Sequence, residues 1–162
     1  MIYKKSFINS HTESVPTNIK KLLSMKQFEY VVFTKFINDT NSQYYNTLNY
    51  KGCMTEEDRK IVLDTKNYKV IEKKVYTALN DELNQYIKDN NIDEIYVCGI
   101  DTDACVMKTA LDLFENNYNV KVIEDCSMSH SGADIHNNAV GILKKLIGKE
   151  NVIKMLESVN ND

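Results

Sequence analysis

The stretch that decides the fold is Ile95-Tyr96-Val97-Cys98-Gly99-Ile100-Asp101-Thr102-Asp103-Ala104-Cys105-Val106. An apolar run ends in glycine, a short polar turn follows, and Cys105 stands where a helix over residues 106–116 begins. Free backbone N–H groups and the positive end of the helix dipole both favour a thiolate at such a place. The stretch therefore predicts a nucleophilic thiol between a strand and a helix. The alternative is a buried cysteine that packs as a small apolar residue.

Short apolar runs alternate with segments of helical periodicity along the chain. The expected strands are residues 30–33, 70–71, 95–98, 120–123 and 152–153, and the expected helices are residues 15–25, 55–63, 77–89, 106–116 and 137–146. Residues 38–53 show no clear period, and an irregular stretch of this length indicates a functional loop or an insertion. Buried strands that alternate with helices predict an α/β fold in which helices cover both faces of a parallel sheet.

Length and composition bound the class of protein. A chain of 162 residues with 43% hydrophobic and 27% charged residues is typical of one globular domain, here residues 1–162. A net charge of −3 lacks the excess of positive charge that is typical of proteins that bind nucleic acid. No apolar run reaches the length of a membrane span, and the first residues lack the apolar core of a signal peptide. We therefore expect a cytoplasmic protein that binds neither nucleic acid nor a membrane.

The four cysteines are expected to be free thiols, because a non-secreted chain of this size rarely carries a disulfide framework. They are Cys53, Cys98, Cys105 and Cys126, and they lack the paired short spacing of a zinc site.

Polar residues gather where the expected strands end. Lys73 follows residues 70–71, the segment 101–105 follows residues 95–98, and Asp125 follows residues 120–123. Ligands of a parallel α/β sheet bind at the carboxyl ends of its strands, so these residues are expected to converge. Thr102, Asp103 and Asp125 are expected to be structural, because such side chains usually bond the backbone at turns and strand ends.

The segment from Gly99 to Val106 resembles the nucleophile segment of the isochorismatase-like cysteine hydrolases, which include nicotinamidases and N-carbamoylsarcosine amidohydrolases. Four more stretches resemble the family in the same order: Val70-Ile71-Glu72-Lys73-Lys74-Val75-Tyr76-Thr77-Ala78-Leu79, Thr109-Ala110-Leu111-Asp112, Val122-Ile123-Glu124-Asp125 and His136-Asn137-Asn138-Ala139. In the family the lysine precedes an aromatic residue by three positions, which selects Lys73 over Lys74. The resemblance implies a three-layer α/β/α sandwich with a Rossmann-like parallel sheet.

The resemblance also implies roles for particular residues. The family uses an Asp-Lys-Cys triad, in which Cys105 would be the nucleophile and Lys73 the cation that stabilises its thiolate. The thiolate would add to an amide or similar carbon, and water would hydrolyse the covalent intermediate. A non-proline cis peptide of the family falls on Ile100–Asp101, and the N–H groups of Asp101 and Cys105 would form an oxyanion hole.

The start of the chain departs from the family pattern. The family's catalytic Asp ends the first strand, and counting back from Phe7 places Ile2 where that Asp would stand and Lys4 where a Gln would follow. The first, central strand and its Asp are therefore expected to be missing. Three explanations are open: a truncated start, a degenerate non-catalytic relative, or another carboxylate as substitute, for which Asp39 is the candidate.

Loss of a central strand would leave two strand edges unpaired. Unpaired buried backbone groups cost about 1–3 kcal/mol each. We therefore expect the remaining strands to pair directly with one another, or another chain to supply the pairing.

We expect no metal and no other cofactor. Nicotinamidases of the family bind a divalent metal with one Asp and two His, and His11, His130 and His136 do not follow the second strand, where that cluster belongs. His136 is expected to pack or to cap its helix. His130 lies in a loop after a strand, from which a side chain can reach the pocket.

Two functions of different class remain. The first is a cysteine hydrolase that acts on the C–N bond of a small metabolite. The second is a catalytically inactive homologue that serves as a binding or oligomerisation subunit. A redox-sensing thiol is weaker, because no resolving cysteine is evident. The expected partners are a small-molecule substrate and further copies of the chain in a homo-oligomer.

Overall fold

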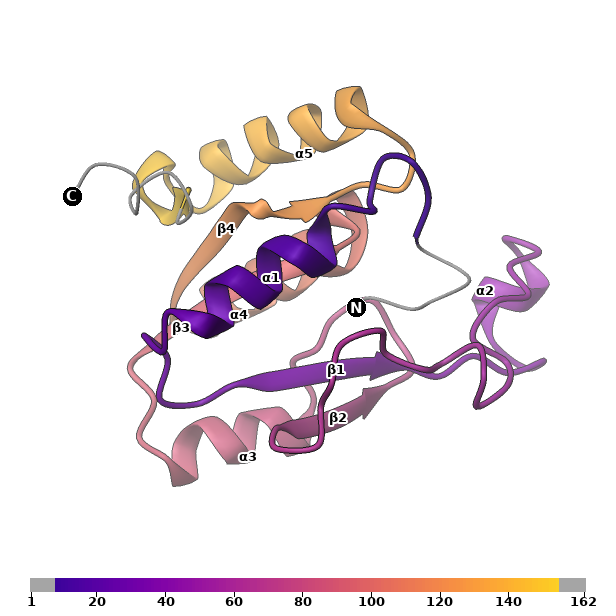
Figure 1. Cartoon of the computed structure of the whole chain (residues 1–162), viewed down its shortest axis with the longest axis horizontal. Helices are drawn as coiled ribbons and strands as arrows, with labels where there is room; N and C mark the ends of the chain where they lie inside the picture. The colour runs from indigo at the N-terminus through magenta and orange to yellow at the C-terminus, as the bar shows by residue number, and fades with distance from the viewer. Residues whose placement is uncertain (1–7, 155–162) are drawn as a thin grey trace.

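Strands and helices alternate along the chain, as the apolar runs predict. A computed structural model describes residues 8–154 (Figure 1). The elements are α1 (Val15–Ser24), β1 (Val32–Phe36), α2 (Gln43–Asn46), β2 (Lys69–Lys73), α3 (Asp81–Asp89), β3 (Glu94–Ile100), a π-helical turn η1 (Thr102–Val106), α4 (Met107–Glu115), β4 (Asn119–Met128), α5 (Ala133–Leu146), a 3₁₀ turn η2 (Lys149–Asn151) and β5 (Val152–Ile153).

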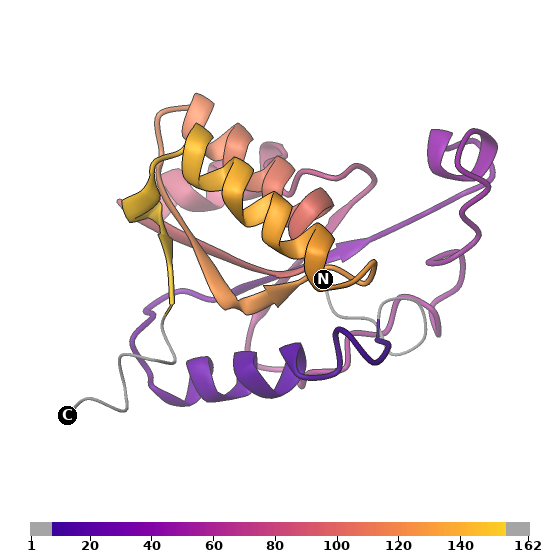
Figure 2. The same ribbon diagram turned by 90° about the horizontal axis from the view of Figure 1, so that it is seen from above.

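All strand pairs are parallel, and helices lie on both sides of them. Within residues 8–154 the strands form two sheets, one of β1 and β2 and one in the order β3-β4-β5. Helices α4 and α5 lie on one side of the strands and α1 on the other (Figure 2). This arrangement confirms the predicted α/β fold with parallel strands.

Direct pairing of the remaining strands is not found in the described part of the chain, and the other expectation, that another chain supplies the pairing, stays a prediction. No ladder joins β1 to β3 within residues 8–154. A cavity of about 520 Å³, lined by Phe33 and Thr34 of β1 and by Tyr96 and Val97 of β3, separates the two strands. The prediction of a missing first strand and Asp falls on residues 1–7, which lie outside the described residues.

Each face of the larger sheet has its own apolar cluster. Successive residues of a strand point to opposite faces, and Val122 and Ile123 of β4 accordingly belong to different clusters. The cluster under α3, α4 and α5 is built around Ile87, Val106, Ala110, Leu113, Val122 and Leu143. The cluster under α1 is built around Val15, Ile19, Leu22, Ile100 and Ile123. The residues that α1 buries follow helical spacing, and Pro16 stands at the first turn, where it costs no hydrogen bond.

Three predicted helices differ from the structure. Helix α5 begins at Ala133, four residues before the predicted start at residue 137. Residues 55–63 form a single turn, in which the amide of Arg59 donates to the Thr55 carbonyl at 3.1 Å. One turn does not recover the cost of helix nucleation, and the guanidinium of Arg59 instead donates to the carbonyls of Cys53 and Met54. Helix α3 begins only after Asn80, whose side chain caps the amide of Leu83.

Candidate active site

Cys105 lies in the first turn of the helical segment that follows β3. Turn η1 continues directly into α4, and the Asp101 carbonyl accepts hydrogen bonds from the amides of Ala104 at 3.2 Å and Val106 at 3.0 Å. Gly99 precedes this turn at φ +127°, a conformation that favours glycine. The peptide bond between Ile100 and Asp101 is cis, at the position that the resemblance implies. The thiol therefore stands at a helix start, as the sequence predicts.

Two buried side chains fasten this turn to the rest of the fold. Thr102 Oγ1 lies 2.8 Å from Nδ1 of His136 in α5, and both residues are buried. The Asp101 carboxylate accepts two hydrogen bonds from His130, one from its backbone amide at 2.9 Å and one from its ring Nδ1 at 2.6 Å. The expected packing role of His136 and the structural role of Thr102 agree with these contacts. His130 contacts Asp101 from the loop after β4.

Lys73 ends β2 and brings its ammonium group to the thiol. Its Nζ lies 3.4 Å from Cys105 Sγ, donates to the Val75 carbonyl at 2.8 Å and also donates to the Tyr76 carbonyl. These three acceptors match the three N–H bonds of an ammonium, whereas a neutral amine has two. Lys74 points elsewhere: its Nζ lies 3.6 Å from the Asp39 carboxylate, and its side chain is 71% exposed. The structure thus brings Lys73, and not Lys74, to Cys105.

Burial and charge act in opposite directions on this pair. Burial raises the pKa of the Cys105 thiol, and the Lys73 charge beside it lowers that pKa. Burial likewise lowers the pKa of Lys73, and Cys105 opposes that shift. Burial raises the pKa of Cys98 to about 11 and also raises the pKa values of Cys53 and Cys126. Among residues 8–154, Cys105 is the only thiol with a hydrogen bond from a lysine.

An aromatic wall stands beside the pair, and sequence reasoning missed it. Tyr44 of α2 packs edge to face on Phe36 and on Tyr76, with ring centroids 4.9 Å apart in both contacts. Lys73 Nζ lies 5.8 Å from the centroid of the Phe36 ring. Burial is the main cause that raises the pKa of Tyr44 and of Tyr76, and Cys105 adds to both shifts. The Phe36 ring therefore lies beside the Lys73 ammonium group, and Tyr44 and Tyr76 continue the same row of rings.

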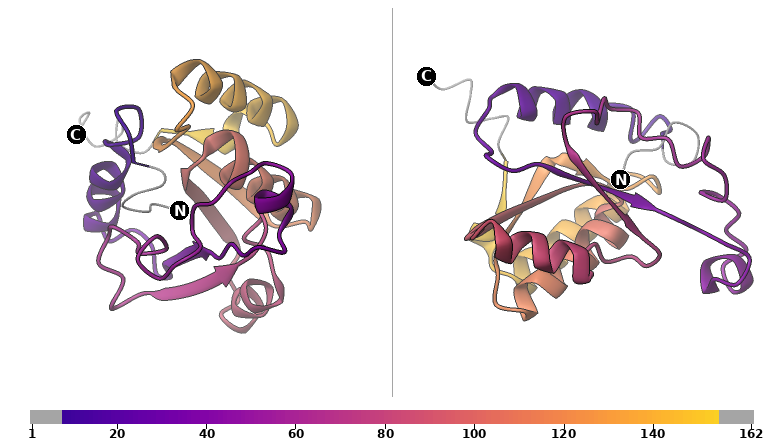
Figure 3. Two further views of the ribbon diagram at one scale, coloured as in Figure 1. Left: turned by 90° about the vertical axis from the view of Figure 1, so that its right-hand side faces the viewer. Right: turned by 90° about the horizontal axis from the view of Figure 1, so that it is seen from below.

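The loop that carries Tyr44 is held by one buried amide. It lies beyond the ends of β1 and β2, apart from the helical layers (Figures 1 and 3). Asn38 is 1% exposed and donates through Nδ2 to the carbonyls of Tyr50 at 2.9 Å and Gly52 at 3.0 Å. Its Oδ1 accepts from the Asp39 amide and from Ser42 Oγ. The predicted functional loop is thus an ordered wall of the site.

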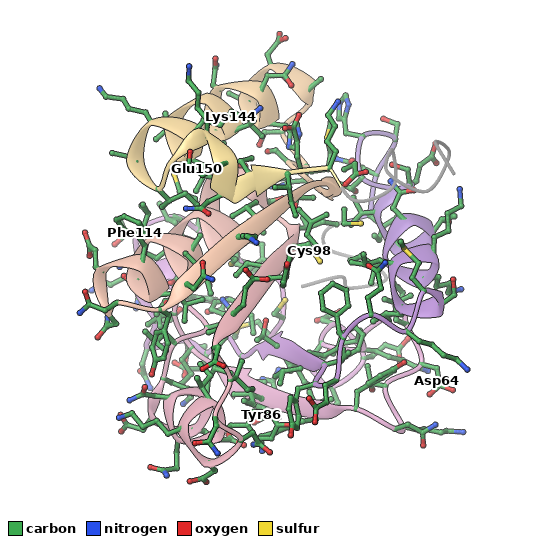
Figure 4. The ribbon with its side chains drawn as sticks, turned by 90° about the vertical axis from the view of Figure 1, so that its left-hand side faces the viewer. Asp64, Tyr86, Cys98, Phe114, Lys144 and Glu150 are labelled. Carbon is green, nitrogen blue, oxygen red and sulfur yellow. The ribbon has the colours of Figure 1, made fainter. Side chains whose placement is uncertain are left out.

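Lys73 and Cys105 both line the 520 Å³ cavity between the two sheets. Cys98 of β3 also lines this cavity and lies in the middle of the molecule (Figure 4). Phe114 of α4 lies at the outer side of the molecule in the same view. The thiol therefore borders a space between the two sheets.

Asp39 does not take the place of a triad carboxylate. It accepts from the Asn41 amide at 2.9 Å and faces Lys74. Within residues 8–154, no carboxylate lies within 4.0 Å of Lys73 Nζ, and no group of three or more His, Cys, Asp or Glu side chains is placed to hold a metal ion. In the same part of the chain, no helix has the length and hydropathy that crossing a membrane requires.

Comparison with known proteins gives a consistent family signal. The family model described as the isochorismatase domain matches residues 3–150. Isochorismatase family protein 2A of Dictyostelium discoideum is 42% identical over 65 residues, which are 39% of this chain and 32% of that protein. The chain thus matches about a third of the length of the curated relatives, 32% to 34% in four of them.

Solved structures show the shared fold. An isochorismatase-like hydrolase from Alkaliphilus metalliredigens has a TM-score of 0.79 at 16% identity, over 91% of this chain and 84% of that chain. N-carbamoylsarcosine amidase from Thermoplasma acidophilum has a TM-score of 0.77 at 18% identity, over 90% of this chain and 85% of that chain.

Proposed function

Because this chain belongs to the isochorismatase family, we propose that it is a cysteine hydrolase that cleaves the C–N bond of a small amide-type metabolite. The observation that carries the proposal is the contact of 3.4 Å between Lys73 Nζ and Cys105 Sγ at the start of a helix. A cation and a helix N-terminus both stabilise a thiolate, which is the nucleophilic form of cysteine. Small amide-type substrates are suggested by N-carbamoylsarcosine amidase, which shares this fold.

In the proposed reaction the Cys105 thiolate attacks the amide carbon and forms a C–S bond. The C–N bond then breaks, and the leaving amine takes a proton from the Lys73 ammonium. Water hydrolyses the resulting thioester, which releases the acid and the thiolate and returns one proton to Lys73. The amides of Asp101 and Cys105 are the proposed donors to the oxyanion, a kind of contact whose loss typically costs about 10²–10³ in rate.

Two measurements test this proposal. Peptide-resolved mass spectrometry follows the alkylation of all four cysteines by iodoacetamide at neutral pH, and Cys105 is expected to react fastest. Release of ammonia or amine is then measured over a panel of small primary amides, ureides and N-carbamoyl compounds. Cys105→Ala should abolish any turnover. Cys98→Ala should retain turnover, because burial raises the pKa of the Cys98 thiol and keeps it protonated. Equal alkylation of the four thiols contradicts the proposal.

A second function is favoured by one observation. In the sequence, Ile2 stands where the resemblance to the family places the triad Asp. A catalytically inactive homologue that serves as a binding or oligomerisation subunit would combine a reactive Cys105 with no turnover across the panel. Turnover that depends on Cys105 excludes this second function.

A further inference from the structure

The proposed reaction gives no role to the contact between Asp101 and His130. The Asp101 side chain is 6% exposed, and its two oxygens accept from Nδ1 of His130 at 2.6 Å and from the His130 amide at 2.9 Å. A carboxylate only accepts, so Nδ1 carries the proton in this contact. The His130 side chain is 47% exposed. The buried Asp101 carboxylate is thus held by His130, which itself reaches solvent. A buried carboxylate is stable only when hydrogen-bond donors compensate it.

The same carboxylate belongs to the turn that carries the nucleophile. The Asp101 carbonyl accepts from the amides of Ala104 and Val106, the two neighbours of Cys105. Burial is the main cause that raises the pKa of the Cys105 thiol and of the Tyr76 phenol. The negative charge of Asp101 raises both pKa values further. The residue that organises the turn therefore also brings a charge that disfavours the thiolate.

We propose that His130 is a positioning residue that holds the Asp101 carboxylate and compensates its negative charge, so that the Cys105 thiolate forms beside Lys73. This inference rests on the proposed function, because it takes Cys105 as the nucleophile. Without the imidazole, the Asp101 charge, which raises the pKa of the Cys105 thiol, would be uncompensated, and a nearby like charge disfavours ionisation. The donor Nδ1 compensates the carboxylate with either charge state of the ring, and most strongly when the ring is protonated.

Other charged and titratable groups face the same two residues. The thiol interacts with Lys73 from β2 and with Tyr44, Cys53 and Tyr76 from the loops beyond β1 and β2. The carboxylate is faced by Asp103 of η1 in addition to His130. The substitutions below leave Lys73, Asp103 and both tyrosines in place, so a shift can be attributed to the Asp101–His130 pair.

The test measures the rate at which iodoacetamide alkylates Cys105 as a function of pH, by peptide-resolved mass spectrometry. His130→Gln should raise the pH midpoint and lower the rate at pH 7 about three- to tenfold, as a thiol pKa higher by about 0.5–1 requires. His130→Arg places an N–H donor with a fixed positive charge there and should not raise the midpoint. His11→Gln, an exposed histidine near the same loop, is the matched control and should change nothing.

The double variant Asp101→Asn/His130→Gln separates an effect of the Asp101 charge from a purely structural role of the hydrogen bond. Asp101→Asn removes the charge and keeps the shape, so His130→Gln should no longer raise the midpoint in that background. An unchanged midpoint in folded His130→Gln, or an equal shift with and without Asp101→Asn, overturns the inference. A wild-type Cys105 that reacts no faster than the other cysteines would instead overturn the proposed function.

Discussion

Replacing Lys73 by methionine removes the ammonium charge from the thiol and keeps a side chain of similar length. Lys73 Nζ lies 3.4 Å from Cys105 Sγ. At that distance two opposite unit charges attract by about 5 kcal/mol at an effective dielectric constant of about 20, which is an upper limit. Opposite charges at this range lower an acid's pKa by about 1–3 units. Removal of Lys73 should therefore raise the pKa of Cys105 by about 1–3 and lower its thiolate fraction at pH 7 about 10- to 1000-fold.

The assay is the rate of iodoacetamide alkylation of Cys105 between mildly acidic and alkaline pH. The rate should recover in Lys73→Met as the pH rises, because the substitution changes ionisation and not access. Lys74→Met is the matched control, since that side chain is 71% exposed and faces Asp39. Lys73→Met also leaves the Val75 and Tyr76 carbonyls without this donor, at about 1–3 kcal/mol each if they stay buried. Thermal unfolding must therefore show a folded variant, and Lys73→Gln keeps a neutral donor there. An unchanged alkylation rate at pH 7 in folded Lys73→Met refutes the reasoning.

Four further substitutions test the parts of the fold that carry the site. Leu113→Ala empties a core position that is 1% exposed and should lower the unfolding free energy in urea by about 2–5 kcal/mol. Phe114→Ala, at 44% exposure, should change it by less than about 0.5 kcal/mol, and equal losses would contradict the assigned faces of α4. Asn80→Ala removes the cap on the Leu83 amide and should cost about 0.5–2 kcal/mol, so an unchanged urea midpoint argues against the cap. Asn38→Ala removes the hydrogen bonds that hold the loop after β1, and hydrogen exchange should accelerate in residues 39–53. Equal acceleration in α4 and α5 would show a global effect instead.

The core strands and helices follow from local pattern, and the errors lie where that pattern is short. The helix predicted over residues 15–25 is α1, because Pro16 and three spaced apolar residues specify one start and one buried face. The segment 55–63 begins with Thr55-Glu56-Glu57-Asp58, four residues that resemble a helix N-terminus, yet the helix ends after one turn because Arg59 donates to carbonyls outside it. A local signal of four residues cannot report where a long side chain will find its acceptors.

The site divides in the same way. Cys105 is predicted from its own neighbours, since a strand, a glycine and a polar turn place it at a helix start. The resemblance selects Lys73 over Lys74, and the structure places Lys73 at the thiol. Tyr44 and His130 carry no comparable local signal. Tyr44 reaches the site only because Asn38 folds the loop, and His130 reaches Asp101 from a loop 29 residues away.

The sequence by itself determined the parallel α/β class and the position of Cys105, because both depend on the order of apolar and polar residues within short segments. Only the tertiary structure decided what surrounds the thiol. The contact from Lys73 crosses 32 residues and the contact from His130 to Asp101 crosses 29. Their distances depend on strand register and on loop anchoring, which arise from packing between segments far apart in the chain.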